Sequence, residues 1–334
     1  MIQTKILDKD YKKILELIPI CCVEFVTYYN NQILLVLRGK EPVKGEWWFP
    51  GGRVYKNERL EEAVIRKAYE ELGLEVKIDR KVGVYETMFK NGPFDDLNTG
   101  VHSVNVCFVV HPIDKDVKVK IDGTNSLADL KSVLLKKAKI ILFGNSHGFF
   151  NDLELQEAIL REINAEFYIY EMLEETNILS SEDYLKFLSR PDSEDFSIIS
   201  KIEEIRPTIL LAEKYNLKVI GCDIKDMGRE NNEFLNKTEL SKEEEKEEEN
   251  LLLKREAHQA KIIEDYSKKT DKTIFVSLGA YHLRKDSLVL KMLNSEDILV
   301  CYPSFKGLPC FGPEEGMTRD KIKYVIQLKK DYLM

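Results

Sequence analysis

The chain has 334 residues, of which 43% are hydrophobic and 32% are charged. This composition is that of a folded protein, the length favours two domains, and disordered and collagen-like chains are excluded. The 58 acidic residues outnumber the 50 Lys and Arg residues, so the formal net charge is −8. Such a chain has no overall basic field for a nucleic-acid backbone, and we expect no nucleic-acid partner.

The cysteines indicate a reducing compartment. Six of them are scattered, mostly through apolar segments, without C-x-x-C spacing, which is typical of reduced thiols rather than of a disulfide or zinc framework. The first residues carry no apolar signal segment, and no apolar stretch reaches the roughly 18 residues that span a bilayer. We therefore expect a cytoplasmic protein without a membrane partner.

Short strand-like segments dominate the first third of the chain. They are Cys21–Thr27, Gln32–Leu37, Lys81–Met88 and Val104–Val110. One helix is predicted over Glu61–Leu72, where apolar residues recur at helical spacing, and Gly73 is its expected C-cap. This mixture predicts an α+β domain over residues 1–136.

Strands and helices alternate from about Lys139 onwards. The predicted strands are Ile140–Phe143, Phe167–Tyr170, Lys218–Cys222, Thr273–Leu278 and Ile298–Cys301. Helices are expected near Leu153–Ile163, Ile209–Tyr215 and Ser287–Leu293, and a long charged helix is expected to include the acidic run Glu239–Glu249. Such alternation predicts an α/β domain over residues 137–334, with a mainly parallel sheet and helices on its faces.

The segment around Gly51 and the following helix carries one set of chemical groups. A glycine pair at Gly51 and Gly52 lets the backbone approach an ion or a phosphate closely. Glu70 and Glu71 supply hard oxygen ligands suited to Mg²⁺, which would neutralise a diphosphate. Arg66, one turn before Glu70, can pair with a carboxylate and fix its orientation.

The spacing of these residues resembles the Nudix box. The matching positions are Gly52, Glu58, Arg66, Glu70, Glu71, Gly73 and Leu74. Lys67 departs from the box, because the family has a Glu there that is often a metal ligand or base. The resemblance implies a Nudix α/β/α sandwich in the N-terminal half, a hydrolase, and a Mg²⁺ site at Gly51, Glu70 and Glu71.

The departure at Lys67 points to one branch of that family, the GDP-mannose mannosyl hydrolases, which cut the sugar C–O bond. Further positions are similar to that branch, namely Arg38, Pro42, Gly45, Trp48, Arg53, Asp95 and His102. The resemblance implies that Arg38 and Arg53 bind the diphosphate and stabilise the leaving nucleotide. It also implies that Glu71 and the Gly51 carbonyl hold one Mg²⁺. Trp48 and Asp95 are expected at the substrate.

A water molecule must be activated to attack the sugar. The mannosyl hydrolases use a His in a loop after the last core strands, and the corresponding residues 122–126 contain none. Either His102 or a carboxylate such as Asp95 is then the base, or the activity is weak or lost. We keep these alternatives open.

A second set of chemical groups follows the strands of the C-terminal half. His147 and His282 each end a G-x-x-H turn after a strand, and Glu171 follows a third strand. Carboxyl ends of parallel strands meet at one edge of the sheet, where this set could bind a second divalent metal or activate water. The pattern resembles the superfamily of TraB, TIKI, ChaN and erythromycin esterases. It implies a hydrolase-like domain with His147, Glu171 and His282 as catalytic residues.

We therefore expect a Mg²⁺-dependent Nudix hydrolase acting on a nucleotide sugar and releasing GDP and sugar, fused to a second hydrolase-like domain. The alternative is a nucleotide-sensing Nudix module that regulates a C-terminal metallohydrolase or esterase-like domain. A homodimer is a further expectation.

Overall fold

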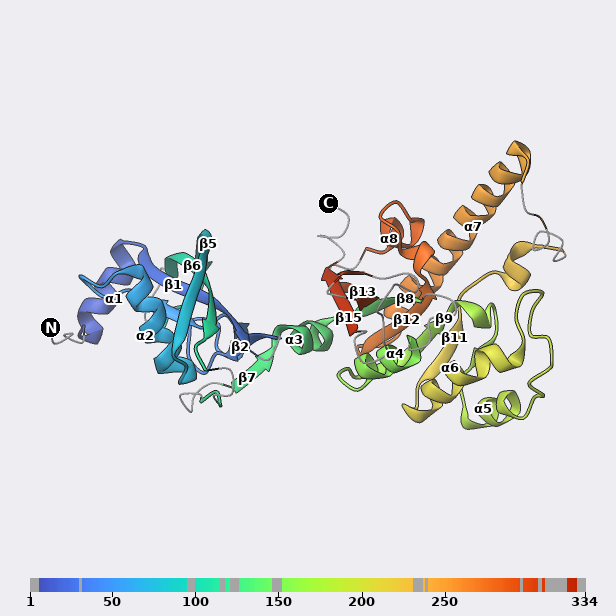
Figure 1. Cartoon of the computed structure of the whole chain (residues 1–334), viewed down its shortest axis with the longest axis horizontal. Coiled ribbons are helices and arrows are strands. Elements are labelled where there is room, and N and C mark those ends of the chain that lie inside the picture. Colours follow the sequence, from blue (N-terminus) through green and yellow to red (C-terminus); the bar gives the residue numbers. More distant parts are fainter. Residues whose placement is uncertain are drawn as a thin grey trace. The chain divides into compact units, whose positions relative to one another are not determined.

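A computed structural model describes the chain (Figure 1). The described residues are 6–29, 32–94, 100–114, 118–120, 126–145, 152–230, 237, 240–294, 297–305, 308–309 and 323–328. The chain divides into two compact units, Met1–Val133 and Leu134–Met334, and each unit has its own sheet.

A mixed sheet forms the first unit, in the order β3-β2-β1-β6-β5, with β4 paired to β1 and β7 paired to β2. Strands β1 and β6 run parallel, and the other pairs run antiparallel. The predicted strands correspond to β1, β2, β5 and β6 and are confirmed. The elements are α1 (Asp8–Leu17), β1 (Ile20–Tyr29), β2 (Gln32–Leu37), β3 (Trp47–Trp48), β4 (Gly51–Arg53), α2 (Leu60–Leu72), β5 (Val76–Phe89), β6 (Val101–Pro112) and β7 (Ser126–Asp129).

Helix α2 packs its apolar stripe on this sheet. Ala63, Val64, Ala68 and Leu72 are fully buried and belong to one core cluster with apolar residues of β1 and β6. Gly73 ends the helix in the left-handed region, at φ 66°, and its N–H bonds back into the last turn. The predicted helix and its C-cap are therefore confirmed.

The second unit is an α/β fold. Its helices and strands are α3 (Leu130–Lys137, which begins in the first unit), β8 (Ile140–Asn145), α4 (Asp152–Leu160), β9 (Ala165–Tyr170), β10 (Asn177–Ile178), α5 (Ser181–Leu188), α6 (Ile202–Lys214), β11 (Lys218–Gly221), α7 (Lys242–Ser267), β12 (Thr273–Gly279), α8 (Leu288–Met292), β13 (Ile298–Phe305), β14 (Leu308–Pro309) and β15 (Lys323–Leu328). Short 3₁₀ turns are η1 (Glu171–Leu173), η2 (Lys225–Gly228) and η4 (Ala280–Leu283).

The centre of the second sheet is parallel, as predicted. Strands β11-β9-β12-β8-β13 lie in this order and pair in parallel, while β10, β14 and β15 add antiparallel pairs. Successive residues of β12 enter different core clusters, with Phe275 in one and Val276 in the other. Because neighbouring strand residues face opposite sides, the sheet is covered on both faces. Helices α4, α5 and α6 contribute to the first cluster, and α7 and α8 to the second (Figure 1).

The start of helix α6 differs from the sequence prediction, whereas helix α7 agrees with it. Helix α6 begins at Ile202 rather than at the predicted Ile209, and Pro207 lies inside it. A proline inside a helix costs about 3 kcal/mol, which the full burial of Ile202 and Ile205 offsets. Helix α7 includes most of the acidic run, as predicted, and Ser241 caps it by accepting a bond from the N–H of Glu244.

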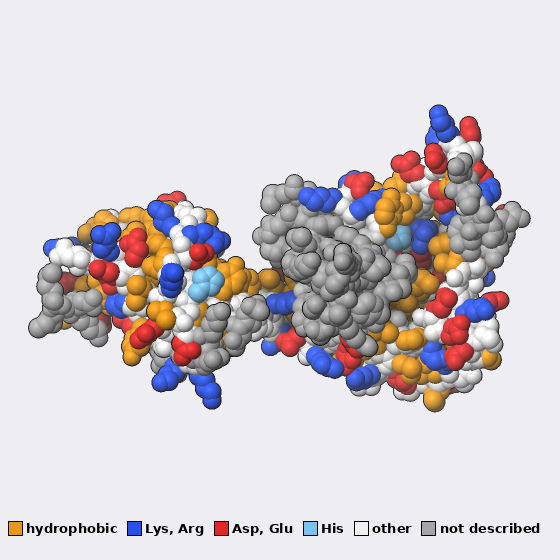
Figure 2. Space-filling model, in the orientation of Figure 1, with side chains coloured by type: hydrophobic (Ala, Val, Ile, Leu, Met, Phe, Trp, Pro, Cys, Tyr) orange, Lys and Arg blue, Asp and Glu red, His pale blue; other side chains and the backbone are white. Residues whose placement is uncertain are grey.

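Charged side chains of both signs are interspersed over the face of each unit drawn in Figure 2. Among the residues that the structure describes, no helix combines the length and apolar character that crossing a membrane requires.

Candidate active site

A cavity of about 360 Å³ lies in the first unit, beside β1, β4 and α2. It is lined by residues that the sequence singles out and by others that it does not. The predicted site residues among them are Arg38, Trp48, Gly51, Arg53 and Glu71, Arg66 and Lys67 of the box also line it, and Glu24 is a lining residue that the sequence did not single out. The structure therefore brings both arginines and Glu71 to one cavity.

Gly51 allows strand β4 to lie directly against β1. A Cβ atom added at this position would lie 2.3 Å from the carbonyl oxygen of Val23, so no larger residue fits. The N–H of Gly51 donates to Oε2 of Glu71 over 3.1 Å. The loop backbone thus faces the carboxylate of the helix.

Arg66 ties the loop to helix α2. Its guanidinium donates to both carboxylate oxygens of Glu58, over 2.6 and 2.9 Å, and to the carbonyl of Arg53 over 3.0 Å. The hydrogen bonds from Arg66 lower the pKa of Glu58. This pairing matches the expectation that Arg66 orients a carboxylate, and it fixes the loop that carries Arg53.

Lys67 lies between the carboxylates of Glu70 and Glu71. Its Nζ is 2.8 Å from Oε1 of Glu71 and 3.2 Å from Oε2 of Glu70. Burial by itself would lower the pKa of Lys67, but the neighbouring charges of Glu71 and Glu70 raise it. The ammonium group is therefore held in its charged form.

The two arginines are anchored at the cavity wall. Arg38 donates its Nε–H to the carbonyl of Pro42 over 2.8 Å. The guanidinium carbon of Arg53 lies 3.9 Å from the ring centroid of Tyr11, a cation–π contact that restrains it. Together they make this cavity suited to an anion such as a diphosphate.

Trp48 and Glu24 form another wall of the cavity. The indole Nε1–H of Trp48 donates to Oε1 of Glu24 over 2.8 Å, and the Trp48 ring lies against Phe89. The sequence analysis did not identify Glu24. Its only sequence signal is an acidic residue inside an apolar strand, between Val23 and Phe25.

His102 and Asp95 are the two residues predicted as candidates for the base of the first unit. His102 is not among the lining residues, whereas its strand neighbours Val101 and Ser103 are. Side chains of a strand alternate between faces, and the Nε2 of His102 lies 3.4 Å from Glu86 instead. The structure thus does not place His102 at the cavity, and Asp95 lies outside the described residues.

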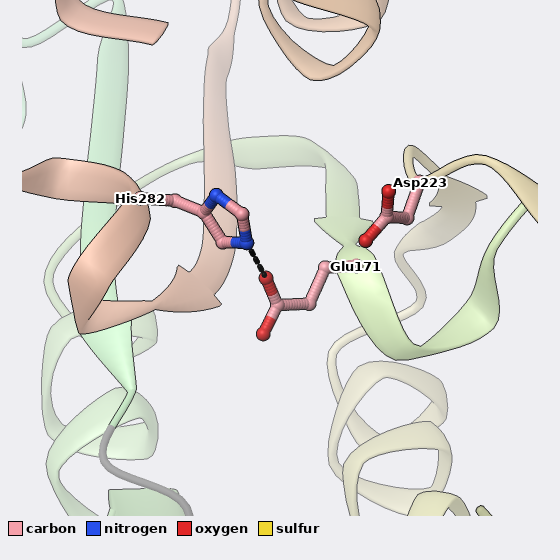
Figure 3. Close-up of side chains that lie close together, drawn as sticks. All are labelled: Glu171, Asp223 and His282. Atoms are coloured by element: carbon pink, nitrogen blue, oxygen red, sulfur yellow. Dashed lines mark ion pairs between the residues drawn. The ribbon is translucent and has the colours of Figure 1, made fainter. Parts of the chain in front are cut away.

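A larger cavity, of about 1180 Å³, lies at the carboxyl ends of the parallel strands in the second unit. Glu171 follows β9, Asp223 follows β11, and His282 lies in η4 after β12. One ligand atom from each of these buried side chains lies within 4.8 Å of the others, and the three converge in Figure 3. His147 lies outside the described residues.

His282 is held between two carboxylates. Its Nε2 is 3.6 Å from Oε2 of Glu171 and its Nδ1 is 3.5 Å from Oε1 of Glu256 (Figure 3 shows the first pair). Glu171 accepts a 2.6 Å bond from the N–H of Gly279. Burial would raise the pKa of Glu256, but the bonds from His282 and Arg284 lower it. Glu256 is fully buried and was not identified from the sequence, where its only signal is its position beside Arg255.

Asp223 is paired with an arginine. Both of its carboxylate oxygens accept bonds from Arg255, each about 3.0 Å from Nε. This pairing compensates part of the charge of Asp223. Glu171, Asp223 and His282 still offer one ligand atom each, a set that could hold a metal ion. The second divalent-metal site stays a prediction.

Comparison with known proteins identifies the first unit. A family model described as the NUDIX domain matches residues 23–148. The chain is 33% identical over 138 residues to an ADP-ribose pyrophosphatase of Methanocaldococcus jannaschii, which covers 40% of this chain and 78% of that protein. The chain belongs to the Nudix family. This membership confirms the Nudix α/β fold in the N-terminal part, as the resemblance implied.

Two further Nudix relatives illustrate how much of the chain is matched. The low-salt glycan biosynthesis protein Agl8 of Haloferax volcanii is 35% identical over 96 residues, which are 29% of this chain and 62% of that protein. The chain thus spans less than two thirds of Agl8. A crystal structure of a MutT Nudix hydrolase from Burkholderia pseudomallei is 24% identical, with a TM-score of 0.28, over 35% of this chain and 85% of that chain.

Nudix enzymes generally use a divalent ion such as Mg²⁺. In this Nudix cavity the carboxylate of Glu71 offers hard oxygen ligands beside two guanidinium groups, and Gly51 is a lining residue whose carbonyl would be the second ligand that the resemblance implies. A carboxylate and a carbonyl fit one Mg²⁺ together with phosphate oxygens. Glu70 is not among the lining residues. Its side chain is 43% exposed, pairs with Arg66, and shares the ammonium of Lys67 with Glu71. Its role as a ligand of the same ion stays a prediction.

Proposed function

We propose that the N-terminal unit hydrolyses a nucleotide sugar of the GDP-mannose type at the sugar C–O bond, with Mg²⁺, and releases a nucleoside diphosphate and the free sugar. The observation that carries this proposal is the joint presence of Arg38, Arg53 and Glu71 in one cavity. Two guanidinium groups and one carboxylate there suit a diphosphate and one cation.

In this proposal the arginines make the main electrostatic contribution to catalysis. Arg38 and Arg53 bind the diphosphate, and their charge is most favourable where negative charge develops on the departing nucleotide. A Mg²⁺ ion at Glu71 would supply further positive charge to the same diphosphate. Lys67 reduces the negative charge available for clustering several ions, and this favours cleavage at the sugar carbon over cleavage between the phosphates.

The water that attacks the sugar needs a base. Of the described residues, Glu24 is a carboxylate at the cavity with its orientation fixed by the indole N–H of Trp48. We propose Glu24 or Asp95 for this role. Loss of turnover in Glu24→Gln or in Asp95→Asn, with nucleotide binding retained, would distinguish the two.

The names of two relatives support a nucleotide-sugar class. One relative is named for glycan biosynthesis and another for ADP-ribose, a ribose linked through a diphosphate to a nucleoside. The mannose and guanine parts of the proposal rest on the resemblance of Trp48, Arg38 and Arg53 to the mannosyl hydrolases.

Product analysis tests the proposal. The chain is incubated with GDP-mannose, ADP-ribose and UDP-sugars in Mg²⁺, and phosphorus NMR identifies the products. GDP with free sugar is the expected result. GMP with sugar phosphate would contradict cleavage at the C–O bond, and saturable nucleotide binding without any product would favour the nucleotide-sensing alternative.

For residues 137–334 we propose a second, hydrolase-like domain of the TraB, TIKI, ChaN and erythromycin-esterase type. The observation that favours it is the convergence of Glu171 and His282 at the strand ends of a large cavity. With Glu256 orienting the imidazole, this pair suits general acid–base hydrolysis of an ester, amide or peptide. His147 is retained in this proposal from its G-x-x-H motif.

Metal analysis and substrate screening test this second site. The purified chain is compared with His147→Ala and His282→Ala for bound transition metal and for hydrolysis of ester and peptide substrates. Hydrolysis lost in both variants supports the proposal. Equal activity in all three proteins would contradict it.

A further inference from the structure

The contacts of Lys67 distinguish this Nudix cavity from an open metal site. Its ammonium lies 2.8 Å from Glu71 and 3.2 Å from Glu70, and its side chain is only 16% exposed. A Cβ atom at Gly52 would lie 2.8 Å from Cε of Lys67, so the lysine stem packs directly on the loop backbone. The stem of Lys67 is thus packed against the loop, and its ammonium lies between the two carboxylates.

The charges around Lys67 are already balanced in the free protein. Arg66 pairs with Glu70 over 3.1 Å, and the second oxygen of Glu71 accepts the N–H of Gly51. A divalent ion that binds Glu71 would lie close to the ammonium group of Lys67, which is within about 3 Å of the Glu71 carboxylate. The repulsion between these two cations is large at the dielectric constants of protein sites.

A diphosphate would change this balance. Its oxygens carry negative charge and are themselves hard ligands for a divalent ion. Arg38 and Arg53 would hold it in the same cavity. The flexible stem of Lys67 lets its ammonium turn toward a phosphate oxygen, and this movement frees Glu71 for the ion.

We propose that Lys67 occupies the place of a divalent cation between Glu70 and Glu71 in the free protein, so that a divalent ion binds this cavity only together with a diphosphate. The proposal rests on the proposed function only in that the cavity binds a nucleoside diphosphate. It does not depend on which bond is cleaved.

Mn²⁺ binding followed by water-proton relaxation tests this inference without measuring turnover. Full-length wild type is titrated with Mn²⁺ alone and with Mn²⁺ and GDP or ADP. Relaxation enhancement is expected only when a nucleotide is present. Lys67→Gln should bind Mn²⁺ alone at least about tenfold more tightly than wild type. Lys67→Glu should bind it more tightly still.

Matched variants separate this effect from general changes in charge or folding. Lys67→Arg keeps the cation and should, like wild type, show no Mn²⁺ binding without nucleotide. Lys77→Gln removes an exposed charge of β5 outside the cavity and should behave as wild type. Glu71→Gln should lose Mn²⁺ binding even with nucleotide. Circular dichroism and thermal unfolding confirm that each variant is folded.

Three results would overturn the inference: Mn²⁺ binding to wild type that is unaffected by nucleotide, no Mn²⁺ binding under any condition, or unchanged Mn²⁺ affinity in folded Lys67→Gln. Failure of GDP-mannose hydrolysis would leave these binding results intact. The two proposals therefore fail separately.

Discussion

Neighbouring residues of α2 have different tasks at the candidate site. Arg66 holds the loop through Glu58 and the Arg53 carbonyl, whereas Lys67 faces the carboxylate in the cavity. The box spacing predicted that Arg66 pairs with a carboxylate one helical turn away, and Arg66 does pair with Glu70. It did not predict the contacts with Glu58 and Arg53. It did not predict where Lys67 would place its ammonium, since that depends on the packing of its stem against Gly52.

Replacement of the cavity arginines tests their role at the diphosphate. Arg38→Gln and Arg53→Gln should each lower kcat/KM for the nucleotide sugar by about 100-fold, because each removes a charge that stabilises the departing nucleotide. Arg80→Gln is the control, since Arg80 is exposed on β5 and pairs with Asp79. Steady-state kinetics measure the effect. Equal losses in all three variants would show that the cavity arginines have no special role.

The Glu58–Arg66 pair predicts a pH-dependent stability. The pKa of Glu58 is lowered in the folded state by Arg66, so the pair stabilises the fold above the unfolded pKa of about 4.3 and loses this contribution as pH falls through the folded pKa. Glu58→Gln should cost about 1–3 kcal/mol of unfolding free energy at neutral pH, and less below pH ~4.

Urea unfolding followed by tryptophan fluorescence measures this difference. Both tryptophans of the chain, Trp47 and Trp48, lie in the first unit, so the signal reports on that unit. The exposed Glu61→Gln is the control and should change stability by less than about 0.5 kcal/mol. A penalty for Glu58→Gln that is the same at both pH values would contradict the assigned ion pair.

Site residues were predicted where a sequence motif indicates their position. They were missed where the direction of the side chain depends on tertiary packing. Glu71 was predicted from the Nudix box, and the two arginines from the resemblance to the mannosyl hydrolases. Whether the side chain of His102 points into the cavity depends on which face of β6 meets the cavity. The pattern of neighbouring residues in the sequence does not decide this. Glu24 and Glu256 were missed because each acquires its contacts from segments distant in sequence, Trp48 and His282 respectively.

At the scale of elements, the close approach of β4 to β1 positions the loop of the candidate site. Gly51→Ala should lower the stability of the first unit by about 1–3 kcal/mol, because its Cβ would lie 2.3 Å from the Val23 carbonyl oxygen. It should also lower kcat/KM, since Glu71 loses its bond from the Gly51 N–H. Unfolding midpoints measured by tryptophan fluorescence check this. A variant as stable and active as wild type would show that β4 has room to move.

Strands with strong apolar character and helices with regular apolar spacing were predicted well. Helix α2 and its Gly73 cap were predicted because all their signals are local. The start of α6 was not, because Ile202 and Ile205 lie before Pro207, and a proline is disfavoured inside a helix. Helix α5 was not predicted, and β7 and α3 lie where a domain boundary was expected.

At the scale of the whole molecule, the two units have separate sheets and separate core clusters. A piece comprising residues 1–136 should therefore fold alone and retain nucleotide-sugar hydrolysis within about twofold of the full chain, because its core does not need the second unit. Circular dichroism and steady-state kinetics on the piece measure this. An unfolded or inactive piece, with the full chain active, would show that the second unit is needed for the first.

Cleavage at the sugar C–O bond and cleavage between the phosphates place the oxygen of water in different products. Hydrolysis of GDP-mannose by the full chain in ¹⁸O-labelled water, followed by mass spectrometry of the products, tests it most directly. If Arg38, Arg53 and Glu71 act on a departing diphosphate, the label will appear on the sugar and GDP will be unlabelled. Label in a phosphate-containing product would contradict cleavage at the sugar C–O bond.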